Sequence, residues 1–192
     1  MMSANRQIAA GQNSIQIQGD HNTVVEGDLF LSQKGAGSLT KSEIHRLLRL
    51  VQGDAPASRG KGRLAVPAEM KQKLLFNDAP KYIHKFKNHS VTYQRLQEVA
   101  RGFASNEDIV EMLADFYYDV VEYGPEGDVI VGDGDSRLDA VKEHLHDLLT
   151  HDASFDANEF SEEKLNQFLV ALLQYGVSLC RVLENPGGYA SS

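Results

Sequence analysis

The sequence contains a single cysteine, Cys180, among its 192 residues. A lone cysteine excludes a disulfide scaffold within the chain and a zinc site built from cysteines, and it suits a reducing compartment. No apolar run reaches the roughly 18 residues that a membrane-spanning helix needs, and the first residues lack the apolar core of a secretory signal. We therefore expect a soluble, cytoplasmic protein that does not contact a membrane.

The motifs of common catalytic and metal sites are missing as well. The sequence has no Cys-x-x-Cys, H-E-x-x-H, P-loop or G-x-S-x-G pattern. His144 and His146 are two residues apart, so on a helix they point in different directions and cannot share a metal. Asp133 begins a stretch that resembles a calcium loop, but Leu138 and His144 stand where that loop needs glycine and glutamate. We expect no catalytic residue, metal site or cofactor, and we predict that the protein is not an enzyme.

Charge is distributed unevenly along the chain, whose net charge is −8. Residues 1–40 carry 2 basic and 3 acidic side chains, residues 41–101 carry 13 and 5, and residues 102–192 carry 4 and 19. The middle of the chain therefore has a net charge of +8 and the C-terminal half one of −15. The overall acidity says little about partners, because a partner meets one region at a time.

Residues 11–34 contain a short near-repeat of polar and β-branched residues. Asn13 and Asn22 each begin a segment that ends in Gly-Asp, and the two Gly-Asp pairs are eight residues apart. Gly-Asp marks turns, so we predict two or three very short strands that wind as a coil. Such a coil cannot bury its apolar face alone and is completed by copies from other chains, which makes it an oligomerisation element. The residues expected to mediate this association are Ile15, Ile17, Val24, Val25, Leu29 and Leu31. The alternatives are a small β-meander packed on the protein's own helices, or a partly disordered arm.

Helical patterns follow from residue 40 onward. Thr40 and Glu43 form a capping box before the first helix. A short turn or helix is predicted from Pro67 to residues 75–77. Further helix starts are predicted near Pro80 and at Ser105, Ser136 and Ser161, with a break near residues 88–90 and a short strand at residues 129–131. The last helix, predicted to run from Ser161 to about Glu184, is apolar around much of its circumference and should be central.

These patterns predict a mainly α protein: a bundle of about five helices with a short N-terminal β-coil arm. The expected organisation is a disordered start (1–10), the β-repeat arm (11–34), a helix plus basic linker (35–66), a helical assembly domain (67–186) and a flexible tail (187–192).

The basic middle of the chain could bind nucleic acid. Lysine and arginine side chains contact the phosphates of nucleic acids, and here aromatic side chains lie among them. The candidates are Arg59, Lys61, Arg63, Lys81, Lys85 and Lys87. No base-reading motif accompanies them. The alternative is a solvated face, or one that docks on the acidic half of this or another subunit.

Three strings in the C-terminal part resemble a known family: VPAEMKQKLLFNDAPKYIHKF, SNEDIVEMLADFYYDVV and QYGVSLCRVLENP. They are similar to the C-terminal domain of the third protein of bacterial ABC-three-component (Lamassu-like) anti-phage systems. The family-like motif residues are Phe76, Asn77, Cys180, Leu183, Glu184 and Pro186. Repeats like that of residues 13–28 are also familiar from bacterial conflict proteins, where they link effector and assembly modules.

The resemblance implies a role in assembly. Family members combine with an SMC-like ATPase and a middle component, and often carry an effector domain ahead of this region. Only about forty residues precede the helices here, so we expect no such domain. The resulting hypothesis is a non-catalytic adaptor that forms a homo-oligomer through its arm and docks an SMC-like ATPase, a middle component or a separate effector. The alternative is a protein that contacts nucleic acid through residues 59–87.

Overall fold

The computed structural model describes residues 41–53, 64–153 and 155–189. The chain divides into two units, residues 1–33 and 34–192, and every described residue belongs to the second. The predicted strand arm, including Ile15, Ile17, Val24, Val25, Leu29 and Leu31, lies outside the described residues, as do Arg59, Lys61 and Arg63 of the linker.

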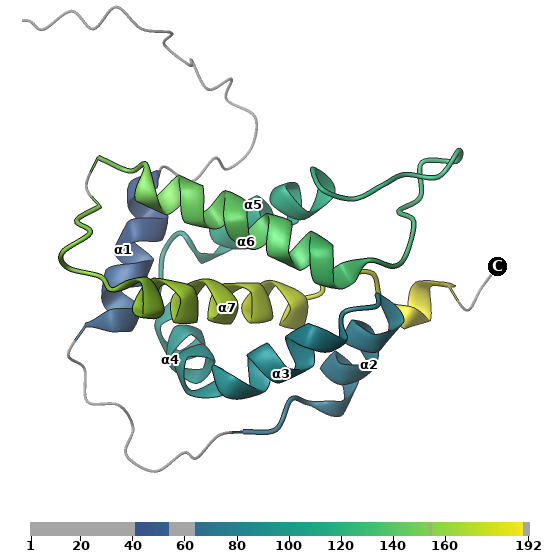
Figure 1. The fold of residues 1–192 in the computed structure, drawn as a ribbon, viewed down its shortest axis with the longest axis horizontal. Helices are drawn as coiled ribbons and strands as arrows, with labels where there is room; N and C mark the ends of the chain where they lie inside the picture. The colour runs from purple at the N-terminus through teal and green to yellow at the C-terminus, as the bar shows by residue number, and fades with distance from the viewer. Residues whose placement is uncertain (1–40, 54–63, 154, 190–192) are drawn as a thin grey trace, which may run out of the picture. The chain divides into compact units, whose positions relative to one another are not determined.

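The described residues form a mainly α fold, as predicted (Figure 1). Its α-helices are α1 (Lys41–Gln52), α2 (Ala68–Phe76), α3 (Pro80–Asn88), α4 (Ser90–Ala100), α5 (Asn106–Tyr118), α6 (Gly134–Thr150) and α7 (Glu162–Ser178), and a 3₁₀ helix, η1 (Pro186–Tyr189), follows. The described part thus has seven α-helices where about five were expected. The difference arises because residues 68–76 are helical and because the segment from Pro80 breaks at His89 into α3 and α4. Within the described residues, no helix is both long and apolar enough to cross a membrane.

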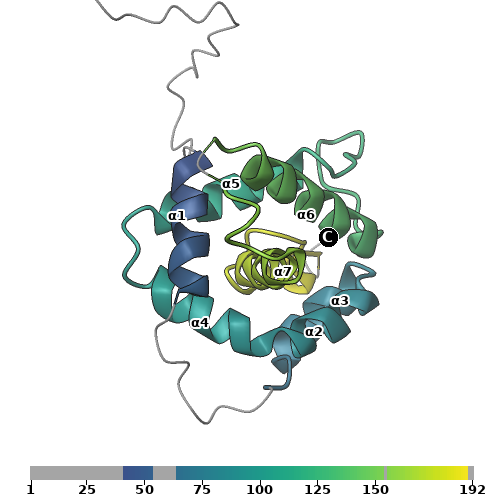
Figure 2. The same cartoon turned by 60° about the vertical axis from the view of Figure 1, so that its left-hand side comes forward.

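Helix α7 lies at the centre of the other helices. Viewed almost along its axis in Figure 2, α1, α4, α2, α3, α6 and α5 surround it. Every residue from Phe168 to Val177 is buried, including Gln174 and Gly176. A helix that is apolar around most of its circumference must be covered on all sides, which explains its central position.

Two helix boundaries differ from the sequence prediction. Helix α6 begins at Gly134 instead of Ser136, because the chain turns at Asp133 in the left-handed region, with φ of 52°. Helix α7 ends at Ser178 instead of near Glu184, because Cys180 is also left-handed, with φ of 58°. The Arg181 amide then donates to Gly176 O and the Cys180 amide to Val177 O, at 3.2 and 3.3 Å. This is a Schellman motif, which terminates a helix. Ser161, by contrast, caps α7 as predicted, accepting from the Lys164 amide.

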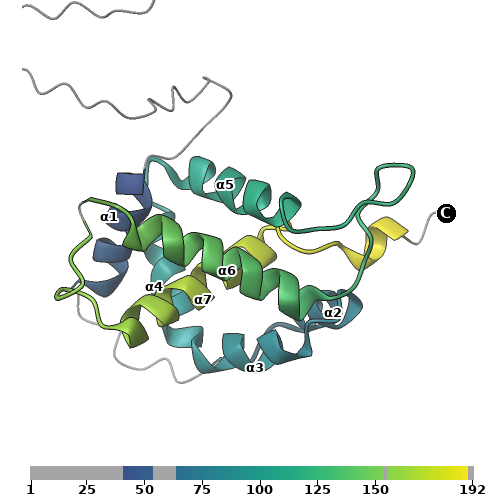
Figure 3. The ribbon, with the colours of Figure 1, turned by 45° about the horizontal axis from the view of Figure 1, so that its top comes forward.

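The connection between α5 and α6 forms a hairpin at residues 122–130 (Figure 3). The Ile130 amide donates to Glu122 O, and the Gly124 amide donates to Asp128 O, at 2.9 and 2.8 Å. Gly127 closes the turn at φ of 87°, a conformation that glycine adopts without steric cost. Of the strand expected at residues 129–131, only a single β-bridge is present, between Tyr123 and Val129.

Candidate functional site

The family-like motif residues meet where α2 and the segment after α7 join. Asn77 is fully buried and follows α2 directly. Its side-chain Nδ2 donates to Glu184 O at 2.7 Å, and its Oδ1 accepts from the Glu184 amide at 2.9 Å. The same Nδ2 donates to Lys73 O at 2.8 Å. The side-chain amide therefore pairs with the backbone of Glu184 as a neighbouring strand would, and fixes the C-terminal segment to α2.

Other motif residues support the same junction. Leu183 is buried, with φ of 67°, and Phe76 is half-buried at the end of α2. Cys180 and Pro186 are exposed. The structure thus brings Asn77 and Glu184 into direct contact, while the exposed residues border the surface beside them.

A groove of about 450 Å³ lies beside this junction, between α2, α4 and the end of α7. Lys73 lines it but is only 4 % exposed, and its Nζ donates to Val177 O at 3.3 Å. Burial lowers the pKa of the Lys73 ammonium, and the nearby Cys180 and Glu184 oppose that shift. An ammonium at the carbonyl end of α7 complements the helix dipole, so Lys73 stabilises the helix end.

Two of the three lysines of α3 converge on one carboxylate of α6. Lys81 and Lys85 both donate to Asp139, Lys85 at 2.9 Å, and the Tyr82 hydroxyl donates to Asp139 Oδ1 at 2.9 Å. Lys85 also lies 4.4 Å from the centre of the Tyr82 ring. Lys87 is exposed. Of the predicted nucleic-acid contacts that the structure describes, two are therefore brought together in an ion-pair cluster and one is apart.

The electrostatics of this cluster follow from burial and charge. Partial burial raises the pKa of Asp139, but hydrogen bonds from Lys81, Lys85 and Tyr82 outweigh it and hold the pKa at about 2. The pKa of Tyr82 is raised, chiefly because the phenol is buried and also because it donates to Asp139. Two of the segment's lysines thus share the single negative charge of Asp139, so the cluster retains a net positive charge.

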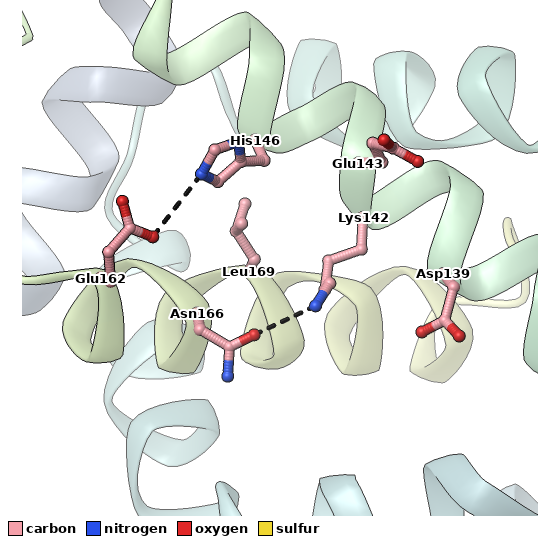
Figure 4. A pocket seen from close by; sticks show the side chains of 7 residues that line it. All are labelled: Asp139, Lys142, Glu143, His146, Glu162, Asn166 and Leu169. Carbon is pink, nitrogen blue, oxygen red and sulfur yellow. Dashed lines mark hydrogen bonds and ion pairs between the residues drawn. The ribbon is translucent and has the colours of Figure 1, made fainter.

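A cleft of about 430 Å³ between α6 and α7 adjoins the cluster (Figure 4). On its α7 side, Lys142 donates to Asn166 at 3.1 Å, and His146 lies 3.8 Å from a carboxylate oxygen of Glu162. Burial lowers the pKa of Lys142, and the charge of Lys85 lowers it further. Acidic and basic groups alternate around the cleft, and in the described part of the chain no cluster of histidine, cysteine or carboxylate side chains could hold a metal ion.

A third feature is an acidic surface on α5 and the 122–130 hairpin, which the sequence reasoning did not single out. Residues 102–136 contain ten acidic side chains and no lysine, arginine or histidine. Three large apolar side chains are exposed there: Tyr118, Tyr123 and Ile130. The number of acidic residues in this segment was the signal that could have identified the surface, but the sequence reasoning counted charge only over the whole C-terminal half.

No family model, curated protein or solved structure matches this chain.

Proposed function

We propose that this protein is a non-catalytic assembly or adaptor subunit of a bacterial anti-phage complex of the ABC-three-component type. It self-associates through the strands predicted at residues 11–34, and its helical domain docks an SMC-like ATPase, a middle component or a separate effector. The resemblance of residues 64–186 to the third protein of those systems motivates this assignment.

The observation that best supports an assembly role is the separation of charge on the helical domain. The acidic surface formed by α5 and the hairpin lies on the other side of α7 from the basic helices α2 and α3 (Figures 1 and 2). Exposed apolar side chains accompany the acidic residues, and such patches mark protein interaction sites. Two surfaces of opposite charge on one rigid bundle suit a protein that holds partners in a fixed relation.

The self-association is tested in the full chain with paired substitutions in the arm. Ile17→Asp with Val25→Asp should lower the mass measured by light scattering to that of a monomer or a smaller oligomer, because charges replace the apolar residues that other copies would cover. Gln16→Asp with Gln18→Asp is the matched control, since it adds the same charge at neighbouring polar positions. Equal masses for both variants and the unmodified chain would contradict the role of the arm.

The docking role is tested with a purified partner. An SMC-like ATPase encoded next to this gene should bind the purified chain with a defined stoichiometry. Failure of the two proteins to bind each other at micromolar concentrations, with or without ATP, would contradict assignment to this class of complex.

A further inference from the structure

Three exposed apolar side chains gather at the base of the 122–130 hairpin. The Tyr123 hydroxyl donates to Tyr118 O at 3.0 Å, which places the ring of Tyr123 beside the end of α5. The Ile130 amide donates to Glu122 O, so Ile130 lies across the hairpin from the residue that precedes Tyr123. Between 45 and 51 % of each of these three side chains is exposed. This is a compact apolar patch that nothing in the described part of the chain covers.

The exposed charged side chains around the patch are acidic, whereas the guanidinium of Arg137, which donates to Ile130 O at 2.7 Å, is buried. Asp119, Glu122, Glu126 and Asp128 are all exposed around it, and residues 102–136 contain no basic side chain. A partner that covers the patch must bring positive charge to its edges, because like charges across an interface cost several kcal/mol.

Exposed lysines accompanied by exposed apolar side chains are found on α2 and at the junction of α3 and α4, and α2 packs on α3. On α2, Lys71 and Leu75 are one turn apart and therefore share a face, and Leu75 is 53 % exposed. Lys87 is exposed at the end of α3, and Val91, in the first turn of α4, is 49 % exposed. Each lysine is thus followed four residues later by an exposed apolar side chain. We call these four residues the basic surface.

Helices α5 and α3, each of which carries part of one of the two surfaces, lie on opposite sides of α7 in all three views (Figures 1, 2 and 3). Each molecule therefore offers both surfaces to other copies. A contact between different patches of two identical molecules is heterologous, and it leaves one acidic and one basic surface free for further copies.

We propose that a second copy of this chain docks its basic surface on the apolar patch and acidic rim of the hairpin. The contact is separate from the predicted arm and specifies one partner of the helical domain, so it rests on the assembly function proposed above. It gives a head-to-tail series of helical domains.

The test uses two charge-reversed variants of the full chain, both of which also carry Ile17→Asp with Val25→Asp so that the arm does not contribute to association. Glu122→Lys with Glu126→Lys cancels the negative charge of the rim, because Asp119 and Asp128 then face two lysines, whereas Lys71→Glu with Lys87→Glu makes both surfaces acidic. Neither variant should bind itself through these surfaces, and we expect each self-association to be at least about tenfold weaker than that of the chain that carries the arm substitutions alone. Mixed together, the two variants retain one intact pair of surfaces and should form a 1:1 complex that does not extend.

In the measurement, one variant is immobilised, and the amount of the other variant or of the same variant that it captures from solution is compared at 50 and 500 mM salt. The lysine variant should capture the glutamate variant and not itself, and the higher salt should weaken this capture because the Debye length falls. The control is Glu143→Lys with Glu163→Lys, which makes the same change in charge at exposed positions on α6 and α7. With the same arm substitutions, this control should self-associate as the chain with the arm substitutions alone does.

The outcomes separate this proposal from the proposed function. If each variant captures itself as well as the other, association does not use these surfaces, and the docking proposal is overturned while the arm experiment still decides self-association. If the chain with the arm substitutions alone shows no salt-sensitive self-association, the docking proposal is overturned as well. Loss of capture in the Glu143/Glu163 control would show a response to net charge and likewise contradict the specific contact.

Discussion

Asn77 connects three segments that are far apart in the sequence. Its side chain satisfies the amide and carbonyl of Glu184 and the carbonyl of Lys73. Its own carbonyl accepts from the Gly134 amide at 2.8 Å, which fixes the start of α6. One fully buried residue thus links the end of α2, the C-terminal segment and α6, so its loss should affect the whole helical domain.

Asn77→Ala should lower the free energy of unfolding by about 3 kcal/mol, because two buried backbone groups of Glu184 lose their partners. Urea unfolding followed by circular dichroism measures this change. Asn88→Ala, at an exposed position in α3, is the control and should change the free energy by less than about 0.5 kcal/mol. Similar effects of the two substitutions would refute the role assigned to Asn77.

The ion-pair cluster around Asp139 should make stability depend on pH. The pKa of Asp139 is about 2 in the folded protein against an ordinary value of 3.8. A lowered folded-state pKa stabilises the protein above the unfolded value, and this contribution is lost as the pH falls from about 4 to about 2. Since 40 % of the Asp139 side chain is exposed, solvent screening reduces the contribution to about 1 kcal/mol.

Asp139→Asn should therefore destabilise the protein at pH 6 and have a much smaller effect at pH 2.5. Denaturant unfolding of both proteins across this range provides the comparison, and the difference between them isolates Asp139 from the other carboxylates. Asp119→Asn, on the exposed end of α5, serves as the control and should show no such convergence. A difference that stays constant with pH would mean that the ion pairs do not contribute.

At the scale of elements, the helix ends decide where the connections go. Helix α2 ends like α7: Asp78 has φ of 54°, and the Ala79 amide donates to Leu74 O at 2.8 Å. Both ends are therefore Schellman motifs, and Asn77 joins them through Glu184. Neither left-handed residue is glycine, so both positions carry the strain of an L-residue in that region.

This explains which parts of the fold the sequence could predict. Helix starts with strong capping signals, such as Ser161, and the break near His89 were predicted, because local chemistry determines them. The left-handed turns at Asp78 and Cys180 could not be predicted, because glycine is the usual signal for such a turn and tertiary packing imposes it here. For the candidate site, the family-like motif named Asn77 and Glu184, but their pairing depends on residues 107 positions apart in the sequence.

Gly134 is the residue on which the start of α6 depends. A Cβ atom at this position would lie 2.4 Å from Asn77 O and 3.0 Å from the Ala79 side chain. Because the first of these neighbours is backbone, the helix must move away and lose its hydrogen bond to Asn77. Gly134→Ala should lower the free energy of unfolding by about 2 kcal/mol or more.

The matched control for this substitution is Gly102→Ala, measured by the same thermal or urea unfolding. At Gly102 a Cβ would meet only Val99 O, at 3.9 Å. That substitution should be neutral or slightly stabilising, because it reduces the entropy of the unfolded chain. If both alanine variants unfold alike, the close approach at Gly134 does not constrain α6.

At the scale of the whole described domain, α7 is the element on which the others depend. Helices α1, α3, α4, α5 and α6 each pack on it, so opening any one of them leaves α7 still covered on its remaining sides. The 122–130 hairpin differs, because its backbone hydrogen bonds lie next to exposed residues and it contributes little to the core. Stability should therefore fall from the centre of the domain towards the hairpin.

Hydrogen exchange measures this gradient directly. Amides from Phe168 to Val177 should exchange only through global unfolding. Their free energy of exchange should therefore equal the free energy of unfolding measured with denaturant, and Asn77→Ala should lower both by the same amount. The amides of Gly124 and Ile130 should exchange through local opening, at a free energy several kcal/mol lower, and should respond little to that substitution. Exchange in α7 that is faster than in α2 or α3 would contradict the central role of α7, because a helix enclosed by its neighbours cannot open before they do.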